Sequence, residues 1–130
     1  MKKLIVFLLL FLFVYSSNLL AGDDQLYKTI SYQSAPYYWH DTKDVEFSGD
    51  FDYHIYVIGI ASPLWRALSM IYTLDEDEYW SDVVAVQGSG YLRSEKYANY
   101  TTDEGVMLFC KIDLPSGSAL EIYTIAEVSW

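Results

Sequence analysis

The sequence predicts an α+β fold, a small strand-rich antiparallel β-meander with one helix packed on it. Three observations lead to this class. Segments of alternating apolar and polar residues recur along the chain, and short stretches rich in Gly, Pro, Ser and Asp separate them. One stretch near the middle instead has apolar residues at helical spacing. Short turns between consecutive strands favour antiparallel hairpins.

Alternation identifies the strands of the predicted sheet. In residues 51–60, Phe51, Tyr53 and Ile55 share one face, while Asp52 and His54 share the other. The other predicted strands are residues 26–32, 83–87, 91–100, 106–114 and 120–129, with 45–48 as a short additional partner. The turns are predicted at residues 48–50, 88–90, 101–105 and 115–118.

The predicted helix begins at Ser62-Pro63. A serine can accept a hydrogen bond from the free amides of a first helical turn, and proline suits the position that follows it. Leu64, Leu68 and Ile71 then lie on one stripe at helical spacing. The helix is expected to end before Asp75, because acidic residues at a helix C-terminus oppose the macrodipole.

Residues 1–21 have the pattern of a secretory signal peptide. Lys2 and Lys3 precede an apolar run of about a dozen residues, and Ser16 interrupts it before the roughly 20 residues of a membrane span. We expect cleavage after Ala21, which leaves residues 22–130 as a single exported domain, secreted or periplasmic. A retained signal would instead anchor the domain to a membrane.

Charge and cysteine content narrow the partners and the redox chemistry. The chain has 8 basic and 18 acidic residues, and loss of Lys2 and Lys3 with the signal lowers the net charge from −10 to −12. Nucleic-acid phosphates repel such an anion, so no nucleic-acid partner is expected. The charge either keeps the domain soluble or steers it toward a basic partner. Cys110 is the single cysteine, so packing rather than an internal disulfide must supply stability.

No combination of residues predicts catalysis, a metal or a cofactor. Cys110 falls on the apolar face of its strand and is expected to be an inert core thiol. His40 and His54 have no further ligand at zinc-site spacing, and His54 is expected to face solvent. The acidic run at residues 75–78 lacks the EF-hand glycine and glutamate, so it is interpreted as a solvated connection, with cation binding as the alternative.

The best candidate for binding is an aromatic cluster that follows Pro36 and consists of Tyr37, Tyr38, Trp39 and His40. Tyrosine and tryptophan rings give large contact area at low entropic cost and carry a polar group. We therefore predict a small acidic, non-enzymatic binding or inhibitor-type module that contacts a protein partner through this aromatic loop. The alternative for the same residues is a lid folded back over the core.

A second function follows from the predicted order of elements. A strand, a helix starting at Ser62-Pro63, Trp80 and a strand meander resemble the middle of START-related lipid-binding domains over residues 51–87. The resemblance implies a carrier that holds a small apolar ligand, such as a lipid, between the helix and a curved sheet.

Overall fold

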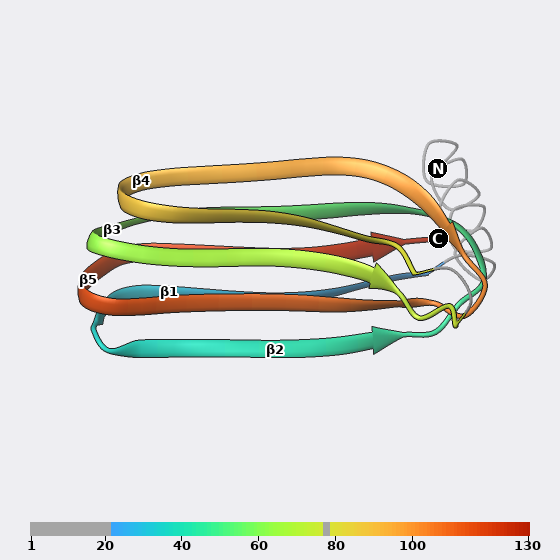
Figure 1. Cartoon of the computed structure of the whole chain (residues 1–130), viewed down its shortest axis with the longest axis horizontal. Coiled ribbons are helices and arrows are strands. Elements are labelled where there is room, and N and C mark those ends of the chain that lie inside the picture. The colour runs from blue at the N-terminus through green and yellow to red at the C-terminus, as the bar shows by residue number, and fades with distance from the viewer. Residues whose placement is uncertain (1–21, 77–78) are drawn as a thin grey trace, which may run out of the picture.

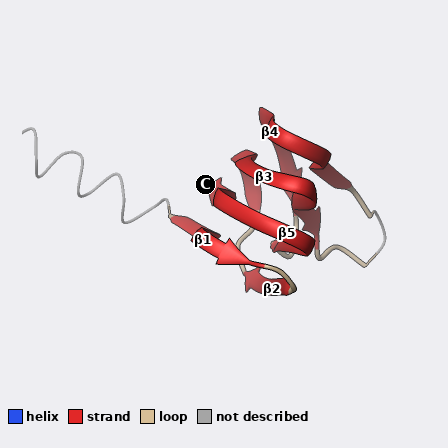
Figure 2. Cartoon of the chain, turned by 90° about the vertical axis from the view of Figure 1, so that its left-hand side faces the viewer, coloured by secondary structure: helices blue, strands red, loops and turns tan. Residues whose placement is uncertain are grey.

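The protein is all-β over the residues that the computed structural model describes, which are 22–76 and 79–130. Its strands are β1 (Asp23–Ser34), β2 (Tyr37–Val45), β3 (Gly49–Thr73), β4 (Ser81–Thr102) and β5 (Val106–Ser129). They form one antiparallel sheet in the order β1-β5-β3-β4, with β2 also paired to β5 (Figures 1 and 2). The predicted α+β class is therefore wrong, because no helix is present in these residues.

The sheet is folded over itself into two layers. Strands β3, β4 and β5 each pass from one layer to the other at a bend, and these bends lie together at the left-hand end of Figure 1. We call this end the fold line and the opposite end, which carries the loops and the C-terminus, the open end. The first layer contains β1 with residues 49–61 of β3, 90–102 of β4 and 118–129 of β5. The second contains β2 with residues 65–73, 81–88 and 106–114 of the same three strands.

Proline and glycine mark the fold line. Pro63 lies where the β3 register with both neighbours shifts, and a proline has no N–H to donate to a sheet ladder. The Ser62-Pro63 and Ala35-Pro36 peptide bonds are both cis. Gly117 adopts a φ of +78°, and a Cβ at this position would lie 1.8 Å from the Ser62 carbonyl oxygen. Only glycine therefore allows β3 and β5 to approach so closely at the bend.

The predicted helix after Ser62-Pro63 is extended strand. From Trp65 onward, alternate side chains point into the core, and Trp65, Ala67 and Ile71 are at most 4% exposed. This period of two is incompatible with a helix. Pro63, which the sequence predicts as the first residue of a helix, instead interrupts a ladder where β3 changes layer.

Most of the predicted strands are confirmed, but two of the predicted turns are wrong. Residues 26–32, 51–60, 83–87, 91–100, 106–114 and 120–129 all lie within strands, whereas only Val45 of residues 45–48 does. Residues 88–90 and 115–118 are bends inside β4 and β5 rather than hairpin turns. The chain reverses direction at the open end, including residues 103–105 between β4 and β5.

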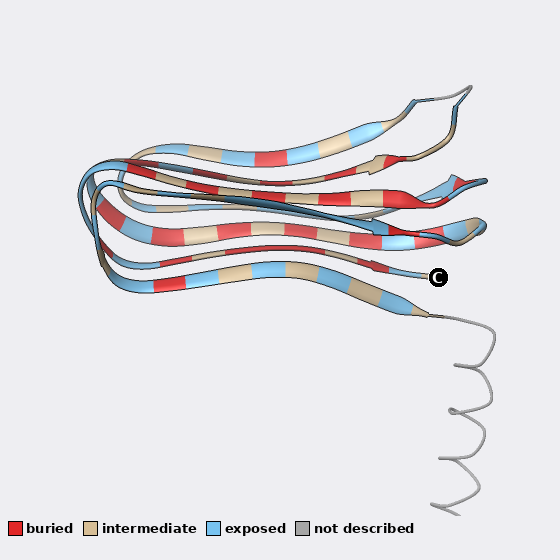
Figure 3. Cartoon of the chain, turned by 90° about the horizontal axis from the view of Figure 1, so that it is seen from below, coloured by how far each residue is buried: buried red, intermediate tan, exposed pale blue. Residues whose placement is uncertain are grey.

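The core fills the space between the layers, and burial alternates most clearly along β3 and β5 (Figure 3). Trp65 is fully buried and donates from Nε1 to the Gly90 carbonyl at 3.0 Å. The layers are also joined directly, because Ser69 Oγ donates to the Ile125 carbonyl at 2.5 Å and Thr124 Oγ1 to the Leu68 carbonyl at 3.0 Å. A carrier cavity between a helix and a sheet has no counterpart in this arrangement, so that alternative loses its structural basis.

The predicted signal peptide, residues 1–21, lies outside the described residues. Within residues 22–76 and 79–130, no helix has the length and apolar character needed to cross a membrane.

Candidate functional site

Strand alternation places five tyrosines on the outer face of the first layer. They are Tyr27 from β1, Tyr56 from β3, Tyr91 and Tyr97 from β4, and Tyr123 from β5. Tyr97, Tyr91 and Tyr27 are 70%, 59% and 57% exposed, and the Tyr56 and Tyr123 ring centroids are 6.1 Å apart. We call this surface the tyrosine face. Its residues come from four strands, so the sheet rather than a loop fixes their spacing.

A histidine held between two carboxylates lies in the middle of the tyrosine face. His54 Nδ1 is 2.7 Å from Glu127 Oε1 on β5, and its Nε2 is 2.9 Å from Glu95 Oε2 on β4. The ring stacks on Tyr97 with a centroid distance of 3.8 Å and on Tyr56 at 5.7 Å. The predicted solvent-facing His54 is therefore wrong, because its side chain is only 11% exposed.

Each ring nitrogen of His54 contacts a carboxylate on a neighbouring strand. The hydrogen bond from His54 lowers the pKa of Glu95 below its ordinary range, and Arg93, 3.1 Å away, acts in the same direction. Both ring nitrogens are occupied, which fixes the ring as a cross-strand link.

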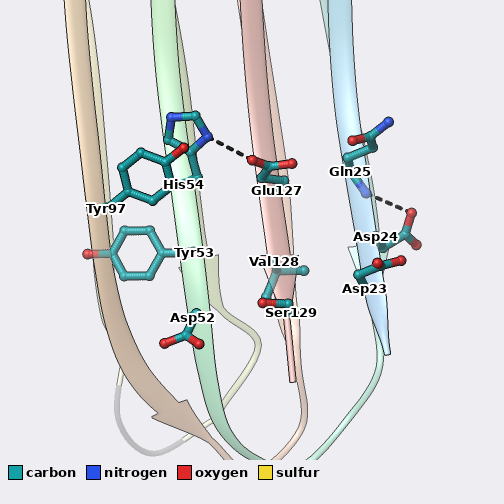
Figure 4. A pocket seen from close by; sticks show the side chains of 10 residues that line it. All are labelled: Asp23, Asp24, Gln25, Asp52, Tyr53, His54, Tyr97, Glu127, Val128 and Ser129. Atoms are coloured by element: carbon teal, nitrogen blue, oxygen red, sulfur yellow. Dashed lines mark hydrogen bonds and ion pairs between the residues drawn. The ribbon is translucent and has the colours of Figure 1, made fainter. Parts of the chain in front are cut away.

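The tyrosine face is hollowed at the open end of the sandwich (Figure 4). The hollow has a volume of about 550 Å³. It is lined by Asp23, Asp24, Gln25, Asp52, Tyr53, His54, Tyr97, Glu127, Val128 and Ser129. One of its four carboxylates, Asp24, pairs with Lys43 at 2.6 Å, and this hydrogen bond lowers the pKa of Asp24. The remaining side chains make a predominantly acidic hollow with the Tyr97 ring as one wall.

The predicted aromatic cluster lies in strand β2 rather than in a loop. Alternation therefore divides it between the two faces of the second layer. Tyr37 and Trp39 are half-buried and pack against the core. Tyr38 and His40 are exposed on the outer side, with ring centroids 5.5 Å apart, and Lys111 lies 5.4 Å from the Tyr38 ring centroid. A role for Tyr37, Tyr38, Trp39 and His40 in binding a partner stays a prediction.

The other residues considered from sequence have structural positions. Cys110 is fully buried, and burial raises the pKa of its thiol, as expected of a core cysteine. Asp75 accepts hydrogen bonds from Thr102 Oγ1 at 2.7 Å and from the Asp103 and Glu104 amides at 3.0 and 2.9 Å. It thus holds the turn between β4 and β5 rather than lying in a merely solvated connection. Residues 77–78 lie outside the described part, in which no group of three or more acidic, His or Cys side chains is placed to hold a metal.

The tyrosine face was missed at the level of sequence, although its signal is present. In residues 91–97, Tyr91, Arg93, Glu95 and Tyr97 occupy every second position, and Tyr56 shares the parity of His54. Interpreting each strand by its apolar face hid the composition of the other face. The pairing of distant strands then decides that these residues meet.

The fold and its surfaces define a two-layer all-β domain, and comparison with known proteins adds no family. No protein-family model matches the chain, and no curated protein sequence matches it significantly. Among solved structures, the chain is similar to infectious bursal disease virus, Gx strain, at 8% identity and a TM-score of 0.45, covering 84% of this chain and 31% of that chain. Carbohydrate-binding modules and viral β-sandwich domains are among the structural neighbours.

Two further neighbours are nearer to this chain in length. TmCBM61 in complex with beta-1,4-galactotriose has 10% identity and a TM-score of 0.45, with 85% of this chain and 87% of that chain covered. The Bacillus endospore appendages, described as disulfide-linked pili, have 9% identity and a TM-score of 0.38 with the same coverage. All of these TM-scores are below 0.5, so no function is transferred from them.

Proposed function

We propose that the chain is an exported, non-enzymatic binding module that engages a basic protein partner through the tyrosine face. The observation that carries the proposal is the convergence of five tyrosines from four strands on one outer face of the sandwich. Tyrosine is enriched at protein interfaces because its ring buries a large area with few rotatable bonds and its hydroxyl can still hydrogen-bond. Outward apolar rings on a rigid sheet need no reorganisation before binding.

Charge favours a basic partner. Residues 22–130 carry a net charge of −12, and the outward positions of the tyrosine face include Asp23, Asp52, Glu95, Glu121 and Glu127 against Arg93. A surface of this kind attracts cations and accelerates encounter with a basic surface. Lysine and arginine side chains also bind favourably to exposed tyrosine rings. A neutral glycan would gain nothing from the same charge.

The state of His54 supports binding rather than catalysis. General acid or base catalysis needs a histidine nitrogen that can reach a substrate. Here both nitrogens contact carboxylates and the ring lies between Tyr56 and Tyr97. The bridge instead joins β4, β3 and β5 across the face and holds two of the tyrosines in place.

The proposal is tested with a fluorescent oligolysine peptide as the probe, followed by anisotropy. We expect Tyr97→Ala combined with Tyr91→Ala to weaken binding about tenfold or more, because exposed interface tyrosines commonly contribute more than about 1 kcal/mol each. Tyr32→Ala is the matched control, since Tyr32 is 84% exposed but lies outside the tyrosine face. Tyr38→Ala, alone and with His40→Ala, tests the aromatic cluster predicted from sequence.

Three outcomes count against the proposal. Equal losses in the Tyr97/Tyr91 and Tyr32 variants would mean that the tyrosine face is not the contact surface. Loss confined to the Tyr38 variants would move the site to β2. Binding of a neutral oligosaccharide that depends on Tyr91 and Tyr97 and is insensitive to salt would identify a glycan, not a basic protein, as the ligand.

A further inference from the structure

The outer face of the second layer, on the opposite side of the sandwich, is apolar over three adjacent strands. Register places Met70 of β3 beside Phe109 of β5 and Val83 of β4, and Tyr72 beside Met107. Val83 is 50% exposed, and Leu68 and Ala85 extend the patch toward the fold line. We call this surface the Met70 face. A contiguous apolar patch across neighbouring strands is typical of a surface that another molecule covers.

Charges of opposite sign lie at the two ends of the Met70 face. Toward the fold line, Lys111 pairs in register with Leu68 on one side and His40 on the other. Toward the open end, Asp44 pairs in register with Met107. Neither Lys111 nor Asp44 has an ion-pair partner among the described side chains, and Lys111 instead lies over the Tyr38 ring.

We infer that the Met70 face packs against the same face of a second copy of this chain. The two copies are related by a two-fold axis that lies in the interface and runs perpendicular to the strands, through Met70 and Phe109. This axis places each strand over the same strand of the other copy, running in the opposite direction. The row of Leu68, Lys111 and His40 then faces the row of Tyr72, Met107 and Asp44. Lys111 and His40 of each copy come close to Asp44 of the other.

The same axis gives an exposed aromatic ring a place to pack. A hollow of about 230 Å³ lies at the fold-line end between β3 and β4, and its lining includes Arg66, Leu68 and Ala85. At the other end, Tyr79 lies just before β4, is 68% exposed, and has its ring centroid 5.8 Å from that of Tyr72. The axis places the open end of one copy over the fold-line end of the other and leaves the order of strands across the sheet unchanged. Tyr79 of one copy therefore lies at the hollow of the other. Apolar centre, charged ends and a ring with a matching hollow are the features of an isologous interface.

This inference is independent of the proposed partner binding, since it uses the opposite face. The test is sedimentation velocity on the full chain produced in an exporting host, from about 1 μM to about 1 mM, the range over which moderate self-association is detected. We expect a concentration-dependent dimer. Val83→Lys should weaken it by about a hundredfold, because each dimer receives the substitution twice. Ile60→Lys is the matched control, since Ile60 is a 42% exposed apolar residue on the tyrosine face.

Charge exchange tests the orientation of the two copies. Lys111→Glu and Asp44→Lys should each weaken the dimer about tenfold, and the double variant K111E/D44K should restore it, since it exchanges the two partners of the same contact. Lys111 and Asp44 point outward, so the circular dichroism of these variants is expected to be unchanged. If Val83→Lys fails to fold, the charge variants still test whether the Met70 face forms the dimer. A monomer at every concentration overturns the inference. So does a dimer that Val83→Lys leaves intact, or one that Ile60→Lys disrupts equally.

Discussion

Two glycines at the fold line, Gly90 and Gly117, differ in one respect that a pair of alanine substitutions can measure. Both have positive φ, +84° and +78°. A Cβ on Gly90 would meet nothing within 4 Å, whereas a Cβ on Gly117 would lie 1.8 Å from the Ser62 carbonyl oxygen and 2.4 Å from Pro63 Cδ. Gly90→Ala therefore measures the conformational cost alone, and Gly117→Ala adds the separation of two strands.

The magnitudes follow from this difference. An alanine in the left-handed region costs about 1–2 kcal/mol, which is the whole expected effect of Gly90→Ala. Real Cβ atoms do not approach within 3.0 Å, so Gly117→Ala must move β3 and β5 apart by about 1.2 Å where Pro63 pairs with Gly117. Loss of strand pairing at the bend raises the total to about 3–5 kcal/mol. That is a large share of the 5–15 kcal/mol typical of a domain.

Urea unfolding followed by tryptophan fluorescence measures both variants. With a slope of roughly 1.5 kcal/mol per M, Gly90→Ala should lower the unfolding midpoint by about 1 M, and Gly117→Ala by about 2 M or more. If Gly117→Ala does not fold while Gly90→Ala does, the result also agrees with a larger loss of stability for Gly117→Ala. Equal midpoints for the two variants would show that β3 and β5 do not meet at Gly117 as described.

Three further predictions concern single side chains. Asp75→Ala should lower the free energy of unfolding by about 1 kcal/mol at neutral pH. Because the pKa of Asp75 is lowered in the folded protein, this stabilisation is present above the unfolded pKa and is lost as the pH falls through the folded pKa. Cys110 should react with a thiol reagent only after unfolding, since it is fully buried. His54→Phe should raise the pKa of Glu95, followed by NMR, because the hydrogen bond that lowers it is removed.

Each of these has a clear contrary result. A stability difference between wild type and Asp75→Ala that stays constant down to pH about 2 would show that the Asp75 carboxylate does not stabilise the turn. Rapid modification of Cys110 in the native protein would place it near the surface. A Glu95 pKa unchanged by His54→Phe would mean that the cross-strand bridge is absent, and Arg93→Ala serves there as the comparison for the weaker neighbour.

The mistaken helix has a physical cause in the composition of one strand segment. A strand alternates visibly only when one of its faces is polar. In residues 64–72 the inward side chains, such as Trp65 and Ile71, and the outward ones, such as Leu68 and Met70, are both apolar. Only Arg66 and Ser69 interrupt this apolar run, one pointing outward and the other inward, so polar residues do not mark the period of two and the helical spacing of Leu64, Leu68 and Ile71 is equally regular. The apolar outer face that misled the prediction is the face inferred to pair with a second copy.

Bends and turns could not be separated for a similar reason. Glycine and proline mark any place where a ladder is interrupted, whether the chain reverses or only changes layer. At Gly90, both halves of β4 continue to pair with β3, which is a long-range fact. The strand segments themselves depend on local alternation and were predictable. The tyrosine face depends on local alternation and on long-range strand pairing. Alternation predicts which side of its strand each tyrosine occupies, but its neighbours on the face come from other strands.

Salt dependence distinguishes the two proposed binding surfaces. Binding of a basic partner to the tyrosine face is an attraction between opposite charges, so it should weaken by about tenfold between low salt and about 0.5 M, as screening shortens the range of the field. Self-association joins two copies that each carry −12 over residues 22–130, and its centre is formed by Met70, Phe109 and Val83. Salt screens that overall repulsion and leaves apolar contact intact, so the dimer should hold or strengthen over the same range.

The titration uses the full chain, with oligolysine anisotropy for one surface and sedimentation velocity for the other. Opposite trends are expected because the two equilibria involve opposite faces of the sandwich and opposite signs of long-range interaction. If both weaken in parallel, self-association is electrostatic, and the contacts of Lys111 with Asp44 rather than the apolar centre hold it together. The single variants Lys111→Glu and Asp44→Lys then distinguish the cases, because a dimer held by those contacts is lost in each of them, whereas a dimer held by the apolar centre is only weakened.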